Sequence, residues 1–184
     1  NHHLILVGEE IEKETVSARL IDRTLRPLFP EGYFNEVQIM VMVLSSDQEN
    51  DADVLGLIGA STALSMSELP FYQPVGAVRV GRANGEFIVN PTFSELETCD
   101  INLVVAGTKD FVNMVEGECR EVSEGELLSA VEFGHKQIQK LVELQKELCV
   151  RVGKPKPQVE VPVMEAELVE AVTALGLEKI KEAN

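Results

Sequence analysis

The chain has 184 residues, with 31 acidic and 16 basic side chains, so its formal net charge at pH 7 is −15. Apolar residues make up 45% of it, which excludes a mostly disordered protein, and 13 Gly and 8 Pro exclude a collagen-like or low-complexity chain. The length corresponds to about one domain of roughly 150 residues with a small remainder. The negative charge argues against a generally basic nucleic-acid coat, because non-specific affinity for RNA comes from Lys and Arg at phosphates.

Targeting and redox signals favour a cytoplasmic protein. Three cysteines, Cys99, Cys119 and Cys149, are scattered without a Cys-x-x-Cys pair, which argues against a metal cluster or a disulfide framework. No apolar run approaches the roughly 18 residues of a membrane span, so no membrane partner is expected. The apolar residues Leu4 to Val7 lack a basic segment before them and are too few for a signal peptide. Since there is no initiator Met, we expect the chain to begin inside a longer protein or to carry a foreign N-terminal remnant.

The first half of the chain predicts two helices around one strand. Helical spacing of apolar residues predicts a helix over Glu9–Leu28, which two prolines end. The apolar run Val37–Leu44 favours a buried strand by its length and its β-branched residues, although periodicity alone does not distinguish it from a short helix. A second helix, rich in small residues that would let it lie close to a sheet, is predicted over Val54–Leu69, with Asp51 or Asp53 as its N-cap.

Two hairpins are predicted next. Strands at Val75–Val80 and Glu86–Val89 flank an Asn-Gly pair, which is a strong turn signal. A second strand pair is predicted at Ile101–Ala106 and Phe111–Glu116.

The C-terminal part predicts two helices and a linker. The longest helix is expected over Ser123–Val152, and Ser123 with Glu126 forms a capping box at its start. A Pro-flanked extended segment follows, and an amphipathic helix is predicted over Met164–Ala183. Taken together, the hairpins predict an α+β fold, with an antiparallel or mixed sheet and helices on one side of it.

The stretch Arg19–Gly32, RLIDRTLRPLFPEG, resembles the polynucleotide phosphorylase (polyribonucleotide nucleotidyltransferase) family. Further motifs match this family and are specific in combination: IGAS at 58–61, ALS at 63–65, PVGAVRVG at 74–81, NP at 90–91, LVVAG at 103–107 and FGH at 133–135. The resemblance covers most of this chain but only a minority of a full-length family member.

The resemblance implies a ribonuclease PH-like fold, similar to domain 2 of ribosomal protein S5. Its mixed sheet, with helices packed on it, would be incomplete at the N-terminus and followed by a short helical segment. Residues 1–11 stay unassigned, because they do not resemble the family's N-terminal strands or its RNA-gripping aromatic-arginine loop. Residues 12–153 are interpreted as part of the first ribonuclease PH-like domain, 154–163 as a linker and 164–184 as the start of the all-helical domain.

The resemblance also implies an activity for the whole protein. Family members are cytoplasmic 3′-to-5′ exoribonucleases that act in RNA degradation and mRNA turnover. They use inorganic phosphate to release nucleoside diphosphates, and the reaction is reversible. They form a homotrimer with RNA in a central channel, need Mg²⁺, and have the RNA-degradation machinery as a further expected partner. We expect no Mg²⁺ bound to this chain by itself, since the second ribonuclease PH-like domain, which carries the chemistry in the family, is absent.

Two positions predict that this half is catalytically degenerate, with no catalytic residue and no metal ligand of its own. Active ribonuclease PH-like domains hold phosphate with a loop before the small-residue helix, and here that loop is 50–53 (Asn-Asp-Ala-Asp), whose two carboxylates would repel phosphate. Active domains also place an aspartate where this chain has Asn90, and a neutral amide is a poorer Mg²⁺ ligand than a carboxylate. A competent small phosphorylase is therefore the less favoured interpretation.

Arg19, Arg23 and Arg26 are the candidate RNA- or phosphate-binding residues. Spacings of four and three place them on one helix face, and guanidinium groups suit phosphate oxygens. In the alternative interpretation the face is solvated, and Arg19 and Arg23 pair with Asp22, Glu12 or neighbouring residues. The chain would then be a structural and assembly module without a ligand of its own.

Other candidates are weaker. Arg79 and Arg82 flank the first hairpin, where a structural role is favoured over anion binding. The alternating acids from Asp47 onward lack the Gly and Glu of a calcium-binding loop. His135 has no evident nucleophile partner and is expected to contact the core.

Overall fold

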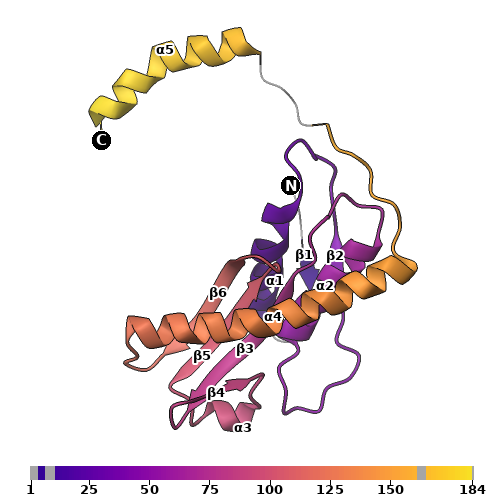
Figure 1. Ribbon diagram of the computed structural model, residues 1–184, viewed down its shortest axis with the longest axis vertical. Coiled ribbons are helices and arrows are strands. Elements are labelled where there is room, and N and C mark those ends of the chain that lie inside the picture. The colour runs from indigo at the N-terminus through magenta and orange to yellow at the C-terminus, as the bar shows by residue number, and fades with distance from the viewer. Residues whose placement is uncertain (1–3, 7–10, 161–164, 184) are drawn as a thin grey trace.

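A four-stranded antiparallel sheet with the strand order β4-β3-β5-β6 forms the centre of the fold (Figure 1). The structure is a computed structural model, and it describes residues 4–6, 11–160 and 165–183. The strands of this sheet are β3 (Gly76–Ala83), β4 (Glu86–Val89), β5 (Ile101–Gly107) and β6 (Val112–Cys119). Both predicted hairpins are therefore present, and β3 and β6 extend beyond their predicted ends.

Local backbone requirements explain where the hairpins turn. Asn84 and Gly85 have φ angles of +52° and +80°, the left-handed conformation that a tight two-residue turn needs. The β5–β6 connection has a register irregularity at Gly107, where an added Cβ would lie 2.3 Å from the carbonyl oxygen of Phe111. Only glycine fits there without moving the backbone.

Helices cover both faces of this sheet. The helices α1 (Ile11–Leu25) and α2 (Asp53–Met66) lie on one face, and α4 (Glu124–Val152) lies on the other (Figure 1). The expectation of helices on one side was wrong, because successive β3 residues are buried on opposite faces: Ala77 packs in the α1–α2 core and Val78 packs in the α4 core. The α+β class itself is confirmed.

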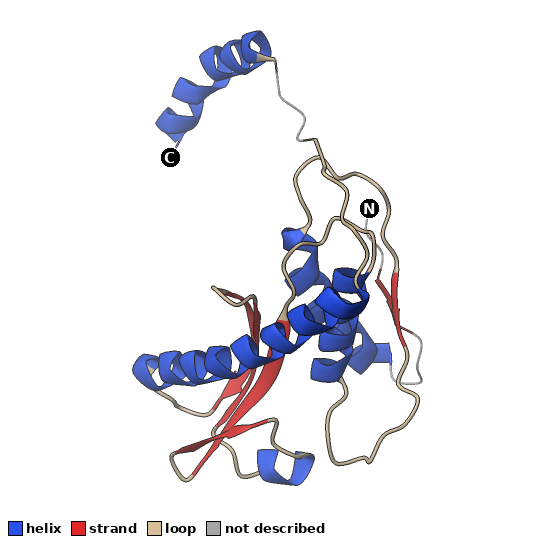
Figure 2. Ribbon diagram, turned by 45° about the vertical axis from the view of Figure 1, so that its right-hand side comes forward, coloured by secondary structure: helices blue, strands red, loops and turns tan. Residues whose placement is uncertain are grey.

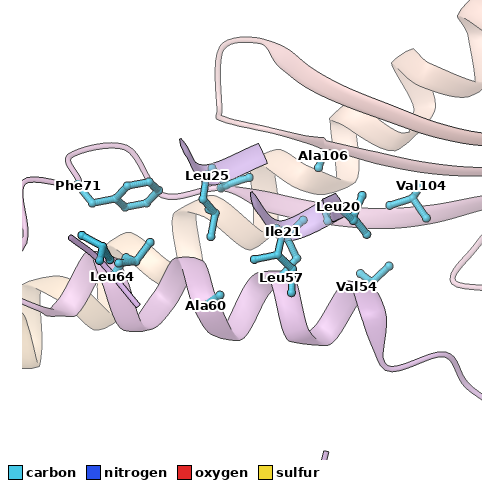
Figure 3. Packing of buried hydrophobic residues seen from close by; sticks show 13 residues of the cluster. Leu20, Ile21, Leu25, Val54, Leu57, Ala60, Leu64, Phe71, Val104 and Ala106 are labelled. Atoms are coloured by element: carbon cyan, nitrogen blue, oxygen red, sulfur yellow. The ribbon is translucent and has the colours of Figure 1, made fainter. Parts of the chain in front are cut away.

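The α1–α2 core fixes the orientation of α1. Its members from α1 are Leu20, Ile21 and Leu25, all at most 3% exposed. Figure 3 shows them with the α2 residues Val54, Leu57, Ala60 and Leu64 and with Phe71. Because these apolar residues recur at helical spacing, the opposite face of α1 is left to solvent.

A buried polar network joins α2, α4 and β3. Ser61 Oγ donates to Gln145 Oε1 (2.8 Å), Gln145 Nε2 donates to the Val75 carbonyl (2.8 Å), and the Val75 N–H donates to Ser61 Oγ (2.8 Å). Ser61 and Gln145 are buried, so this closed set satisfies polar groups that would otherwise be costly inside a core. In α4, a Cβ at Gly134 would lie 3.0 Å from Val80 Cγ2, which shows how closely α4 approaches β3.

The predicted strand at Val37–Leu44 is mostly exposed, and only Ile39–Val41 forms a strand, β2. It pairs in parallel with β1 (Leu4–Leu6), which the sequence analysis did not predict. Val37 is buried, but Met42 is 63% exposed and Leu44 is 89% exposed. The expectation of a buried strand was wrong. Among the described residues, β2 pairs with β1 alone, and of its side chains only Ile39 and Val41 pack on the α1–α2 core.

Several helix ends differ from the predicted ones. The helix α1 ends at Leu25 and is followed by a 3₁₀ turn, Arg26–Leu28, in which Pro27 is compatible with the first positions. The N-cap of α2 is Ala52, without a side-chain bond, so the predicted Asp51 or Asp53 cap was wrong. The capping box of α4 is confirmed by the hydrogen bonds of Ser123 and Glu126.

A short helix, α3 (Phe93–Leu96), was not predicted, although its start has a capping box of the same kind as that of α4. Thr92 is its N-cap, and Glu95 occupies the third helical position. The four-residue length explains why apolar periodicity gave no signal.

The segment after α4 is attached to the C-terminal end of α2. The Lys154 N–H donates to the Met66 carbonyl (2.9 Å), and Lys156 Nζ donates to the carbonyls of Leu64 (2.7 Å) and Ser67 (2.5 Å). These hydrogen bonds satisfy carbonyl groups at the end of α2, where a helix has no N–H donors of its own for them.

The last helix, α5 (Ala166–Ala183), lies apart from the sheet and its covering helices (Figure 2). Its predicted start at Met164 falls outside the described residues. The division of the chain at 11/12, 153/154 and 163/164 stays a prediction.

Candidate functional site

The three predicted arginines lie on the solvent face of α1 and of the turn that follows it. Arg19, Arg23 and Arg26 are all exposed, because the residues between them, Leu20, Ile21 and Leu25, are held in the core. Arg26 forms an ion pair with Asp22, one helical turn earlier, in which Nε donates to Oδ1 (3.0 Å) and Nη2 donates to Oδ2.

Arg19 and Arg23 have no ion pair within the described part of the chain, so two guanidinium groups of this face are open to an external anion. The alternative pairing of these arginines with Asp22 does not occur, since Asp22 binds Arg26 instead. The pairing with Glu12 falls on a side chain outside the described ones.

Contacts from the neighbouring strand hold the C-terminal turn of α1. Thr24 is fully buried, and its Oγ1 donates to the Leu20 carbonyl (2.7 Å). Asn113 of β6 donates from Nδ2 to the Thr24 carbonyl (2.9 Å). The arginine face is thus carried by a helix whose rotation and end are both fixed.

A second group of polar residues surrounds Arg79 of β3. Arg79 Nη2 donates to Asp53 Oδ2 (2.6 Å) and lies 3.6 Å from Asp51 Oδ2, while Nη1 donates to Asn102 Oδ1 (2.8 Å). All three charged side chains are at most 16% exposed. Arg79 and Asp51 border a hollow of about 260 Å³ whose lining also includes Asp47, Asn50, Val54, Leu55, Asn90 and Pro91.

The electrostatics of this group are those of a self-neutralised site. Burial raises the pKa of Asp53 above its ordinary value, while the Arg79 guanidinium acts in the opposite direction and Asp51 adds to the rise. The two aspartates neutralise the positive charge that Arg79 would otherwise offer to an anion. Lys13 of α1 also approaches Asp51, with Nζ 3.5 Å from Oδ1, and lies over the Phe93 ring.

Asn90 holds the end of the first hairpin. Its Oδ1 accepts the Arg79 backbone N–H (2.9 Å), its own N–H donates to the Arg79 carbonyl (2.7 Å), and its φ is +50°. Asparagine is among the side chains that tolerate this left-handed conformation. The Asn90 amide oxygen is therefore engaged within the chain.

The residues around Arg79 do not fit a Mg²⁺ ion. Mg²⁺ needs free, hard oxygen ligands, but Asp53 is engaged by Arg79, Asp51 by Arg79 and Lys13, and Asn90 by the backbone. Across the described residues, no group of three or more His, Cys, Asp or Glu side chains is placed to hold a metal ion.

The acidic loop is a turn built on Asp47. Asp47 Oδ1 accepts the N–H groups of Glu49 and Asn50 (2.9 Å each), and Oδ2 accepts Asn50 Nδ2 (2.6 Å). These hydrogen bonds stabilise the carboxylate and lower the pKa of Asp47 to about 2. Of the alternating acids, Asp47 thus serves the turn, whereas Asp51 and Asp53 pair with Arg79.

The arginine that follows in β3, Arg82, serves the fold. Its Nε and Nη2 donate to Asp100 (2.9 and 2.6 Å), and Nη1 donates to Glu126 (2.7 Å), which connects β3 to the start of α4. His135 is part-buried, and its Nε2 lies 3.1 Å from the Thr108 carbonyl, at the β5–β6 connection.

The grouping around Arg79 was not predicted from the sequence. Asp51, Asp53, Asn90 and Arg79 were candidates for separate reasons, and the structure brings them together. Asn102 gave no motif, and only the β3–β5 register, in which Gly81 is opposite Asn102, could have indicated its role.

The chain belongs to the 3′ exoribonuclease family. Residues 7–70 match domain 1 of this family, and residues 73–137 match its domain 2. A solved structure, that of rice (Oryza sativa) Rrp46, superposes with a TM-score of 0.67 over 80% of this chain and 72% of that chain. At 14% sequence identity this likeness concerns the fold, and it confirms the ribonuclease PH-like α+β architecture.

Within the family, the relatives are polyribonucleotide nucleotidyltransferases. The chain is 53% identical to that of Chlorobaculum parvum over 91% of this chain, and 49% identical to that of Sulfurihydrogenibium azorense over 96%. These alignments span 23% and 25% of the two relatives, so the chain covers about a quarter of their length. The resemblance inferred from the motifs is confirmed. Among the helices described, none is both long and apolar enough to span a membrane.

The ion pairs of Arg82 predict an acid-sensitive anchor for α4. Hydrogen bonds from Ser123 and then Arg82 lower the pKa of Glu126 from 4.5 to about 2. A carboxyl group whose folded-state pKa is lowered stabilises the fold above its unfolded pKa, and this contribution is lost as the pH falls through the folded pKa. We therefore expect Glu126→Gln to unfold more easily at pH 7 and to lose less stability than the wild type between pH 5 and about pH 2.

Urea unfolding followed by circular dichroism across this pH range measures the effect. Glu124→Gln is the matched control, since Glu124 is in the same helical turn and has no pairing with Arg82. If Glu126→Gln and the wild type show parallel pH profiles, the ion pair does not anchor α4.

Proposed function

We propose that this chain is part of a 3′-to-5′ exoribonuclease that degrades RNA by phosphorolysis and releases nucleoside diphosphates, and that this part has lost the chemistry and serves the RNA channel and trimer assembly. The curated relatives are named for the nucleotidyltransferase activity, which supports the first half of the proposal. The observation that carries the proposed loss of chemistry is the pairing of Arg79 with Asp53 and Asp51.

The charges around Arg79 leave no place for phosphate. An inorganic phosphate would have to displace Asp53 from a 2.6 Å contact and lie beside two carboxylates that are at most 16% exposed. Repulsion between like charges is strongest where solvent screening is weak, as it is in this part-buried position. Since the same carboxylates and Asn90 are engaged within the chain, Mg²⁺ has no ligand set here either. In the whole protein, Mg²⁺ would act at the second ribonuclease PH-like domain.

The arginine face of α1 is the surface proposed to contact RNA. Arg19 and Arg23 are exposed, and the folded core fixes the helix that carries them. On a chain with a net charge of −15, a local cluster of guanidinium groups is the arrangement by which an acidic protein can still bind a polyanion. The whole protein would be a cytoplasmic homotrimer, with this face toward the RNA channel.

The first test is phosphorolysis by this chain alone, whose folding is first verified by circular dichroism. Incubation with short poly(A), inorganic phosphate and Mg²⁺ is expected to release no ADP, because phosphate cannot bind beside Asp51 and Asp53. Release of ADP at catalytic turnover would contradict the loss of chemistry in this part.

The second test is RNA binding by the variant Arg19→Ala/Arg23→Ala. We expect weaker binding of labelled oligo(A) in fluorescence anisotropy. The slope of log K against log salt should also become shallower by about 0.7 for each RNA phosphate that the variant no longer neutralises. The control Lys136→Ala/Lys140→Ala removes the same charge from the exposed side of α4 and should leave the slope unchanged. A variant with altered stability but unaltered RNA binding would instead support a purely structural and assembly module.

A further inference from the structure

The ion pair between Asp22 and Arg26 has a geometry that restricts the arginine. Arg26 is the first residue of the 3₁₀ turn after α1, and its side chain is 55% exposed. The guanidinium is held side-on, with Nε and Nη2 directed at the two oxygens of Asp22. A side-on pair uses one edge of the planar guanidinium and leaves the N–H groups of the other edge available.

Asp22 is well placed to act as an anchor. Its side chain is 22% exposed, much less than that of Arg26, and its neighbours in sequence include Ile21, which is 1% exposed. The carboxylate is thus carried by a rigid part of α1, whereas Arg26 lies where the α-helix has ended. When a long, flexible side chain is already held in place, less conformational entropy is lost as the ligand binds.

We propose that Asp22 is a positioning residue that holds Arg26 so that its free edge meets an RNA phosphate beside Arg19 and Arg23. This inference rests on the proposed RNA contact of the arginine face. It assigns to an acidic residue a favourable role in binding a polyanion.

A positioning role for Asp22 predicts a change in RNA affinity opposite to the change that its charge alone would cause. A carboxylate that acts only through its charge repels RNA, so its removal raises the affinity. A carboxylate that positions Arg26 does the reverse, since its removal frees the arginine and the ordering of that side chain must then occur on binding.

The experiment compares Asp22→Asn with Glu14→Gln, which removes one acid from the same helix at a position outside the arginine spacing. Binding of labelled oligo(A) to the full chain is measured by fluorescence anisotropy at several salt concentrations. We expect Asp22→Asn to weaken binding about two- to tenfold, the cost of ordering one long side chain, and Glu14→Gln to leave it equal or slightly stronger.

A second variant keeps Asp22 in place. Arg26→Lys retains the positive charge but cannot form the side-on pair, so it should weaken binding to the same extent as Asp22→Asn. The two substitutions combined should cost no more than either alone, because both remove one coupled interaction. Thermal unfolding of each variant separates this effect from a decrease in the amount of folded protein.

The outcomes distinguish the two proposals. If Arg19→Ala/Arg23→Ala weakens binding while Asp22→Asn binds as tightly as the wild type or more tightly, the positioning role is overturned and the RNA contact stands. If Arg19→Ala/Arg23→Ala has no effect on binding, the RNA contact itself is overturned, and the role of Asp22 with it.

Discussion

The burial of both faces of strand β3 is the constraint on which the rest of the structure depends. Ala77 must pack against α1 and α2, and Val78 must pack against α4, so helices are required on either side of the sheet. Arg79, between Val78 and Val80, then carries a charge into the space between the sheet and the start of α2. A charge that is largely withdrawn from water has to be paired and hydrogen-bonded.

The partners of Arg79 follow from this placement. Asp53 is the first residue of α2, and Asn102 lies on the adjacent strand β5, so the guanidinium connects a helix start to two strands. An arrangement that serves the fold in this way removes the positive charge and the oxygen ligands that phosphorolysis would need. The same ion pair therefore explains both a stable α2–β3 contact and the proposed loss of catalysis. The solvent face of α1 keeps the exposed arginines that are the proposed RNA contacts.

The sequence predicted those features that depend on a few neighbouring residues. The Asn84-Gly85 turn and the capping box of Ser123 and Glu126 are local, and the structure confirms both. The features that it did not predict depend on tertiary neighbours. Val37–Leu44 is apolar enough for a buried strand, but burial requires a covering layer that the described residues do not supply.

The candidate site divides in the same way. The spacing of Arg19 and Arg23 was sufficient to predict a common helix face, since α-helix geometry determines it. Arg26 lies in the 3₁₀ turn after α1, so its exposure beside them required the structure. The pairing of Arg79 with Asp53 spans 26 positions in sequence and arises only when β3 and α2 pack together. The family resemblance was enough to predict that this part of the chain does not bind phosphate. The ion pair between Arg79 and Asp53, which gives the physical reason, was visible only in the structure.

The most direct test of this account is a phosphate titration of the wild type and of Asp51→Asn/Asp53→Asn, followed by the NMR signals of the Arg79 guanidinium. The account predicts no phosphate-dependent shift in the wild type, and a saturable shift in the variant, in which Arg79 has lost its internal anions. Saturable binding of phosphate to wild-type Arg79 would contradict the claim that this site is neutralised from within the chain.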